Sequence, residues 1–175
     1  TALAGVGTVF ASDDKQSTGF ENGSSKLDIT QTGRYTSGMT NPDGGVMEIV
    51  TYNTKTGFAY AVNGQSGCLT AIPIDKIENN KSVNQLEGNN IDIKSLVEAG
   101  GYKYGDMTSV VVSPDGTKLA VAIQSDDYSA NGKAAVFSCN DDGTLTLLYI
   151  AATGVQPDMI TFTPGGSKVL TANEG

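Results

Sequence analysis

Histidine and tryptophan are both absent from this sequence of 175 residues. Without histidine, the chain cannot form a Ser-His-Asp triad, a zinc site with imidazole ligands or an imidazole acid–base catalyst. Without tryptophan, an aromatic surface for stacking against a sugar ring must come from the 7 tyrosines and 5 phenylalanines. The lack of histidine, together with the lack of any nucleophile motif, favours a function that depends on binding.

Basic residues are also scarce. There are 11 lysines and arginines against 19 aspartates and glutamates, which gives a formal net charge of -8 at pH 7. Binding to a nucleic-acid backbone requires clustered cations, and because the sequence has no such cluster, we predict no nucleic-acid partner. No stretch approaches the roughly 20 apolar residues of a membrane-spanning helix, so we expect no span in this segment.

A repeated hairpin is the dominant pattern. An apolar run, a tight turn and a second apolar run follow one another in Val112–Ala122 and again in Phe162–Ala172, and a divergent copy occupies Tyr52–Val62. Proline presets φ in two of these turns, and glycine tolerates the positive φ that hairpin turns require. Around the second copy the pattern predicts four consecutive antiparallel strands, at Ser109–Ser113, Lys118–Gln124, Lys133–Cys139 and Leu145–Ala152.

Four-stranded antiparallel units that recur about every 50 to 60 residues are typical of β-propeller blades. We therefore predict an all-β fold of propeller blades, with a β-sandwich as the alternative. The predicted domain division is an N-terminal segment and linker over residues 1–26, then a partial propeller over 27–175. The partial propeller comprises an outer strand at 27–35, a blade at about 46–94, a blade at about 109–152 and a half blade at 158–174.

These units are too few to close a propeller ring, which takes roughly four to eight blades. We therefore expect the chain to be the N-terminal part of a longer protein, and its first strand to be the outermost strand of the last blade. Residues 1–11 are small and apolar, and Val9–Ala11 has the small-x-small pattern of a signal-peptidase site. An ordinary first strand explains these residues equally well, and residues 12–25 have the composition of a solvated linker.

Only two cysteines occur, Cys68 and Cys139. When the third strands of the two predicted blades are aligned, Cys68 opens its strand and Cys139 ends the equivalent one. Six residues at about 3.3 Å each separate them by roughly 20 Å along the strands, whereas a disulfide needs Cα atoms within about 7 Å. Both thiols are therefore predicted to be free.

Several stretches in combination resemble the choice-of-anchor I domain family. They are Tyr35–Gly38, Met47–Tyr52, Ala61–Gly64, Gln156–Pro164 and Leu170–Gly175. That family contains secreted or surface-anchored bacterial proteins, some labelled alkaline-phosphatase-like or mesenchyme-specific cell-surface glycoprotein, and its members resemble seven-bladed, lactonase-like propellers. The resemblance implies an extracellular or cell-surface location, and it supplies no catalytic residues for this chain.

Candidate site residues lie in the loops between blades and in those that join second and third strands, because these loops share one face of a propeller. Asp43 and Asp106 bring carboxylates to that face. For ligand binding we select Asp126, Asp127, Tyr128, Asn63 and Asn173. For a divalent cation such as calcium we select Asp158 and Glu174, since clustered oxygen atoms are its preferred ligands. The alternative for the carboxylates is an ordinary turn cap or surface charge, and the alternative for the stretch from Ser125 to Tyr128 is a solvated loop.

Two functions fit the sequence. The first is an extracellular propeller that serves as a binding or scaffolding module for an unknown ligand. The second is a metal-dependent hydrolase, phosphoesterase or lactonase-like, that uses carboxylates at the propeller channel. In either case we expect an open, apolar blade face bearing Ile160, Phe162, Val169 and Leu170. Such a face should contact the rest of the protein's own chain or a second copy.

Overall fold

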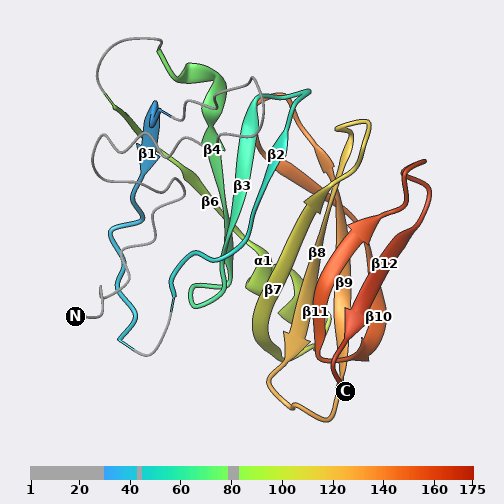
Figure 1. Cartoon of the computed structure of the whole chain (residues 1–175). Coiled ribbons are helices and arrows are strands. Elements are labelled where there is room, and N and C mark those ends of the chain that lie inside the picture. The colour runs from blue at the N-terminus through green and yellow to red at the C-terminus, as the bar shows by residue number, and fades with distance from the viewer. Residues whose placement is uncertain (1–29, 43–44, 79–82) are drawn as a thin grey trace, which may run out of the picture.

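Antiparallel sheets that stand face to face make up the structure (Figure 1). The computed structural model describes residues 30–42, 45–78 and 83–175. The first blade consists of β2 (Val50–Asn53), β3 (Phe58–Asn63), β4 (Cys68–Pro73) and β6 (Asn89–Asp92). The second blade consists of β7 (Tyr104–Val112), β8 (Lys118–Ser125), β9 (Asn131–Cys139) and β10 (Leu145–Val155). A half blade of β11 (Pro157–Phe162) and β12 (Val169–Asn173) follows.

The predicted blades are confirmed. Each four-stranded sheet is antiparallel, in the orders β2-β3-β4-β6 and β10-β9-β8-β7. All four strands predicted for the second blade are present, although β7 begins five residues earlier than expected and β10 ends three residues later. The segments 1–11 and 12–25, with their signal-peptide and linker interpretations, lie outside the described residues.

The three hairpin turns are closed by glycine in the left-handed region. Gly116 has φ 68° and its N–H donates to the Ser113 carbonyl at 2.8 Å, and Gly166, with φ 66°, does the same with Thr163. In the divergent copy the positive φ of 76° falls on Gly57, one position later in the alignment, and its N–H reaches the Asn53 carbonyl at 2.9 Å. The copies therefore have the same length but different turn geometry.

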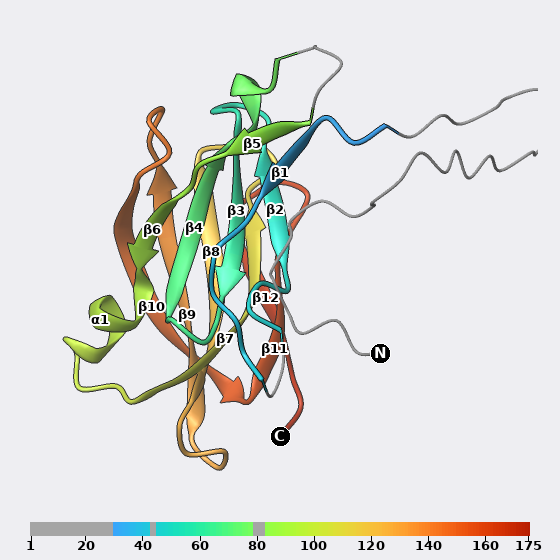
Figure 2. The same cartoon turned by 90° about the vertical axis from the view of Figure 1, so that its left-hand side faces the viewer.

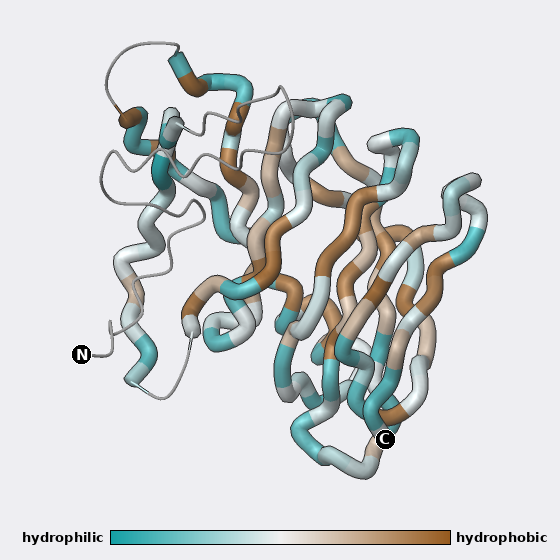
Figure 3. Tube along the Cα trace, viewed as in Figure 1, coloured by the Kyte–Doolittle hydropathy of each residue, from teal (hydrophilic) through white to brown (hydrophobic). Residues whose placement is uncertain are grey.

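Apolar side chains fill the space between the blades. The central strands are apolar and the turns hydrophilic (Figure 3). One cluster, which includes Tyr60, Leu69, Leu119 and Phe137, joins the first blade to the second. A smaller cluster, built on Ala120, Ala122, Ala134, Ile160 and Phe162, joins the second blade to the half blade. Because β8 carries buried residues on consecutive positions, both of its faces are covered, as expected for a strand between two neighbouring sheets.

Two short helices complete the described elements, η1 (Ile74–Lys76) and α1 (Ile93–Glu98). Asp92 caps α1, since its carboxylate accepts hydrogen bonds from the Ser95 N–H at 2.8 Å and the Ser95 hydroxyl at 2.6 Å. Within the described residues, no helix has the length and apolar character needed to cross a membrane.

The two cysteines are free, as predicted. Cys68 begins β4 in the first blade, and Cys139 ends β9 in the second. They therefore lie on different sheets and at opposite ends of their strands.

Of the outer strand predicted at 27–35, the structure describes residues 30–35, and Gly33–Tyr35 form β1. β1 pairs in parallel with β5 (Asn84–Leu86), which lies in the connection between β4 and β6 of the first blade. Together these strands cross the face of the first blade that points away from the second (Figure 2). Tyr35 and Leu86 pack there against Ala61 and Ile72. β1 is therefore paired within this chain, by a strand from the connection between β4 and β6.

The open face of the half blade differs from the prediction. Ile160 and Phe162 are buried against the second blade, and Val169 is partly buried there. The residues that alternate with them point outward, so Met159 is 48% exposed and Leu170 is 53% exposed. The prediction was wrong because successive side chains of a strand point to opposite faces of the sheet. It assigned Leu170 to the same face as Val169, its neighbour in the sequence.

Asn53 joins the hairpin turns of the two blades. Its side chain is fully buried, and its Nδ2 donates to the Gly116 carbonyl at 2.9 Å. Its Oδ1 accepts from the Lys55 N–H at 3.0 Å and the Thr56 N–H at 3.4 Å. One side chain thus holds its own turn and fixes the position of the neighbouring one.

Replacing Asn53 with alanine should lower the free energy of unfolding by about 2 kcal/mol, because buried polar groups lose their partners. Urea unfolding followed by circular dichroism measures this change. Thr54→Ala, an exposed substitution in the same turn, is the control and should change the free energy by less than about 0.5 kcal/mol. Equal losses in the two variants would show that the contact between the turns contributes nothing specific.

We expect the 175-residue chain to associate with itself, because exposed apolar side chains on a sheet face favour a partner. Light scattering across a concentration series measures the association. A variant with Met159→Ser and Leu170→Ser should shift it to higher concentration. Leu148→Ser, which changes an equally exposed leucine on β10, is the control and should have little effect. A chain that stays monomeric throughout would contradict the expectation.

Candidate functional site

A pocket of about 570 Å³ opens between the first and second blades. The described part of its wall comes from five segments: the stretch before β2, the β3–β4 turn, α1 in the connection between the blades, the start of β7, and the end of β8 with the loop after it. These are loops between blades or between second and third strands, as the propeller arrangement predicts. The pocket is therefore built where the ends of two neighbouring sheets meet.

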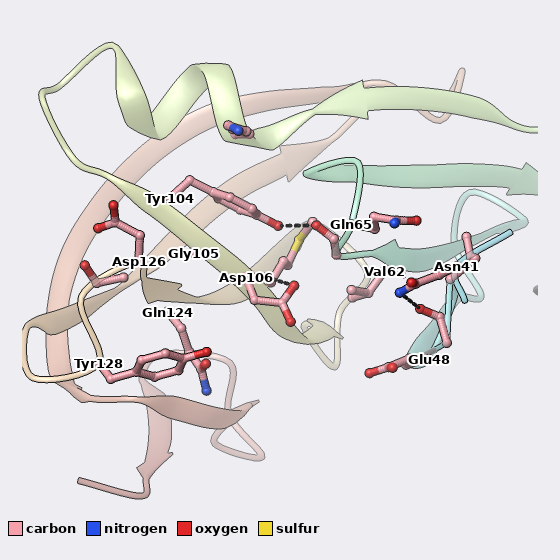
Figure 4. A pocket seen from close by; sticks show the side chains of 16 residues that line it. Asn41, Glu48, Val62, Gln65, Tyr104, Gly105, Asp106, Gln124, Asp126 and Tyr128 are labelled. Carbon is pink, nitrogen blue, oxygen red and sulfur yellow. Dashed lines mark hydrogen bonds between the residues drawn. The ribbon is translucent and has the colours of Figure 1, made fainter. Parts of the chain in front are cut away.

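Polar side chains line most of this pocket. Figure 4 shows Asp106 near its centre, with Asn41 and Glu48 on one side and Gln124 and Tyr128 on the other. Among the residues that the structure describes, the ionisable side chains in the wall are Glu48, Lys94, Tyr104, Asp106, Asp126 and Tyr128. A wall of carboxylates, amides and phenols can accept and donate many hydrogen bonds to a small ligand.

Asp106 is the most perturbed carboxyl group of the pocket. Partial burial raises its pKa, and the nearby carboxylate of Glu48 raises it further, while a hydrogen bond from the Met107 N–H opposes the shift. That N–H donates to Asp106 Oδ1 at 2.8 Å. A Cβ atom on Gly64 would overlap the same Oδ1. Glycine at position 64 therefore leaves the space in which the carboxylate sits.

Tyr104 forms a fixed part of the wall. Its hydroxyl donates to the Gly64 carbonyl at 3.0 Å, which joins β7 to the β3–β4 turn. Burial raises the pKa of Tyr104, and the carboxylate of Asp106 adds to the effect. The Lys94 ammonium lies 5.8 Å from the centre of the Tyr104 ring, within the range of a cation–π interaction. The phenol therefore stays neutral and holds the turn in place.

Asp126 and Tyr128 line the pocket, so two of the five predicted ligand-binding residues come together there. Tyr128 is 73% exposed at the rim. Its carbonyl accepts a hydrogen bond from Gln156 Nε2 at 3.3 Å. Gln156 has φ 49° and is the single non-glycine residue with positive φ among the residues described. A strained residue between β10 and β11 therefore steadies the loop that carries Tyr128.

Asp127 and Asn63 do not line the pocket, although both lie next to residues that do. Asp127 Oδ1 accepts from the Ser129 N–H at 2.9 Å and from its hydroxyl at 2.7 Å, so the carboxylate holds its own loop. Asn63 is fully buried, and its Oδ1 accepts from the Ser66 N–H at 3.3 Å. In the structure both side chains hold turns, which for Asp127 is the alternative considered from the sequence.

Asn173, Asp158 and Glu174 lie away from the pocket, at one end of the half blade. Asn173 is the β12 partner of Pro157, and the Glu174 N–H donates to the Gln156 carbonyl at 3.0 Å. Asp158 and Glu174 are both exposed. The described part of the chain holds no group of three or more His, Cys, Asp or Glu side chains that could bind a metal ion. Asp43 lies outside the described residues, and a calcium site at Asp158 and Glu174 stays a prediction.

The sequence interpretation missed several pocket residues. Glu48, Gln65 and Gln124 were not selected, and Asp106 was noted only as one of several carboxylates on the loop face. These residues share one feature that could have identified them: each lies at or near a strand end that faces the neighbouring blade. That signal becomes readable only after the blades are placed side by side.

The fold and its loop-face pocket define the class: this chain forms consecutive β-propeller blades. A sequence profile of the choice-of-anchor I domain matches residues 48–175. The chain belongs to the choice-of-anchor I domain family. No curated protein matches it.

Solved structures with the same fold are lactonase-like propellers. One is the periplasmic gluconolactonase of Pseudomonas aeruginosa, with 21% identity and a TM-score of 0.57 over 73% of this chain and 32% of that chain. Another is a candidate 6-phosphogluconolactonase of Bacteroides fragilis, with 20% identity, a TM-score of 0.54 and the same coverage. A third, from Bacteroides uniformis, has 19% identity and a TM-score of 0.56 over 85% of this chain and 40% of that chain. This chain thus spans about a third of the first two proteins.

The raised pKa of Asp106 has a consequence for stability. The folded chain binds this proton more tightly than the unfolded chain, whose carboxyl pKa is about 3.9. Stability is therefore lost as the pH rises from that value through the raised pKa of the folded state. Because Asp106→Asn removes this penalty, its urea midpoint should exceed that of the parent chain at pH 7, and the difference should shrink at pH 3.

Asp127→Asn provides a control of opposite sign. Hydrogen bonds from Ser129 lower the pKa of Asp127, so its carboxylate stabilises the fold above the ordinary carboxyl pKa and less as the pH falls. The Asp127→Asn variant should therefore have the lower midpoint at pH 7. An Asp106→Asn variant that is less stable than the parent at pH 7 would contradict the assigned direction.

Proposed function

We propose that this chain forms part of an extracellular β-propeller that binds a small polar ligand in the pocket between its first and second blades. The pocket itself carries the proposal. Its volume of about 570 Å³ lies within the usual range for small-molecule sites, about 300–1,000 Å³. Several loops direct polar side chains into one space, and contact between the blades alone does not require this arrangement. The extracellular location rests on the family and on the N-terminal sequence.

Two features suit this pocket to a ligand rich in hydroxyl groups. Carboxylate oxygens of Glu48 and Asp106 accept hydrogen bonds, and the amides of Gln65 and Gln124 both donate and accept them. The phenol ring of Tyr128 at the rim offers a flat surface against the less polar face of a ring. The pocket can thus replace the hydrogen bonds that a sugar-like molecule makes with water.

Lactone hydrolysis is a second candidate function. One observation favours it: Asp106, a carboxyl group whose pKa is raised, lies at the centre of the pocket, and carboxyl groups with raised pKa values serve as general acids or bases. In the reaction, Asp106 would take a proton from water while the water oxygen bonds to the lactone carbonyl carbon. The bond between that carbon and the ring oxygen then breaks, and Asp106 returns the proton to the ring oxygen, which gives a hydroxy acid and restores the carboxylate.

Ligand-observed NMR with a panel of neutral monosaccharides tests the binding function on the whole 175-residue chain. We expect saturation transfer from the protein to at least one sugar, and a loss of about tenfold in affinity in Gly64→Ala. This substitution displaces the Asp106 carboxylate without changing any charge. Gly165→Ala, whose Cβ would meet no atom within 4 Å, is the matched control and should bind like the parent.

Glucono-1,5-lactone added to the same samples, with and without calcium, separates binding from hydrolysis. Hydrolysis above the spontaneous rate that Asp106→Asn abolishes would favour the second function. Binding without such hydrolysis would favour the first. If no sugar binds to the parent chain and the lactone is not hydrolysed, the pocket is not the functional site.

A further inference from the structure

We propose that the pocket between the blades selects neutral polyhydroxylated ligands, of the size of a hexose or its lactone, and rejects phosphorylated or otherwise anionic ones. The inference rests on the proposed function of this pocket and deepens it. The structures of similar fold do not decide between a phosphorylated and an unphosphorylated ligand, because they include both a gluconolactonase and candidate 6-phosphogluconolactonases.

The balance of charge in the pocket is the first observation. Among the residues that the structure describes, three carboxyl side chains line it, those of Glu48, Asp106 and Asp126, and one basic side chain does, that of Lys94. A phosphate group in this space would face more negative than positive charge. Because charges of like sign repel each other across the pocket, this imbalance disfavours an anion.

The position of Lys94 is the second observation. Its ammonium group lies over the ring of Tyr104, 5.8 Å from the ring centre, and Tyr104 is itself tied to the Gly64 carbonyl. The ammonium group is thus placed against a wall residue. Among the described residues of the wall there is no arginine, the side chain best shaped for a bidentate contact with phosphate. Lys94 is therefore the basic side chain that a phosphate would meet in the described wall, and its ammonium already lies over the Tyr104 ring.

The placement of the carboxylates is the third observation. Glu48 and Asp106 come from different segments and are close enough for the charge of Glu48 to affect Asp106. An added anion would increase this repulsion. A pair of neutral hydroxyl groups would instead donate one hydrogen bond to each carboxylate, and each bond to a charged acceptor is stronger than one between neutral groups. The two carboxylates that repel a phosphate therefore favour the binding of a neutral diol.

Isothermal titration of the whole chain with D-glucose, D-glucose 6-phosphate and D-glucosamine tests the inference. At low ionic strength the dissociation constant of glucose 6-phosphate should exceed that of glucose by at least about tenfold. The ratio should narrow in about 0.5 M sodium chloride, because salt screens the repulsion. Glucosamine, which is cationic, should bind within about tenfold of glucose.

Variants that remove one carboxylate each test whether the pocket causes the discrimination against glucose 6-phosphate. Glu48→Gln and Asp126→Asn, both at exposed positions, should each narrow the ratio between glucose 6-phosphate and glucose. Asp141→Asn removes an exposed carboxylate from the β9–β10 turn, outside the pocket, and should leave the ratio unchanged.

Three results would overturn the inference. Glucose 6-phosphate that binds as tightly as glucose would overturn the selectivity and leave the binding function intact. Glucosamine that binds more than tenfold tighter than glucose would show a cation site instead. The absence of binding by all three sugars would overturn the inference together with the sugar-binding function.

Discussion

Contact between the first strands of successive sheets is the constraint on which the rest of this structure depends. β7 lies between β2 and β11 and is joined to both: the Val112 N–H donates to Thr51 Oγ1 at 3.3 Å, and Thr108 Oγ1 donates to the Pro157 carbonyl at 2.6 Å. These contacts hold the sheets at a distance that lets their apolar faces meet. Since a blade has two apolar faces, each blade needs a neighbour on both sides, and the fold is a series of such contacts.

The pocket is a product of the same constraint. The sheets are in close contact along their strands, but their loops cannot interdigitate in the same way because they carry polar backbone and side chains. A space is left where the loops of the two blades face each other, and the hydrogen bond from the Tyr104 hydroxyl to the Gly64 carbonyl forms part of its wall. Polar side chains therefore gather at the ends of strands whose central residues are apolar. The site needs no insertion or separate domain.

The parts of the structure that local chemistry determines were predictable from the sequence. Glycine in the left-handed region and the flanking apolar runs define the hairpins, and their repetition defines the blades. Long-range pairing was not predictable: the strand at Asn84–Leu86 has little apolar character, and its pairing with β1 follows from burial of Tyr35 against the first blade. The individual roles of Asn63 and Asp127 also required the fold, because a turn cap and a ligand contact use the same residue types.

The two ends of the strands differ in their tolerance of change. At the hairpin end, Gly116 lies against Lys55 and Asn53, and Gly143 lies against Phe58, so a longer or bulkier turn there would collide with the neighbouring blade. At the pocket end, Asp126, Asp127 and Tyr128 are exposed to solvent. A substitution of one of these side chains would therefore meet water and leave the apolar contacts between the blades unchanged.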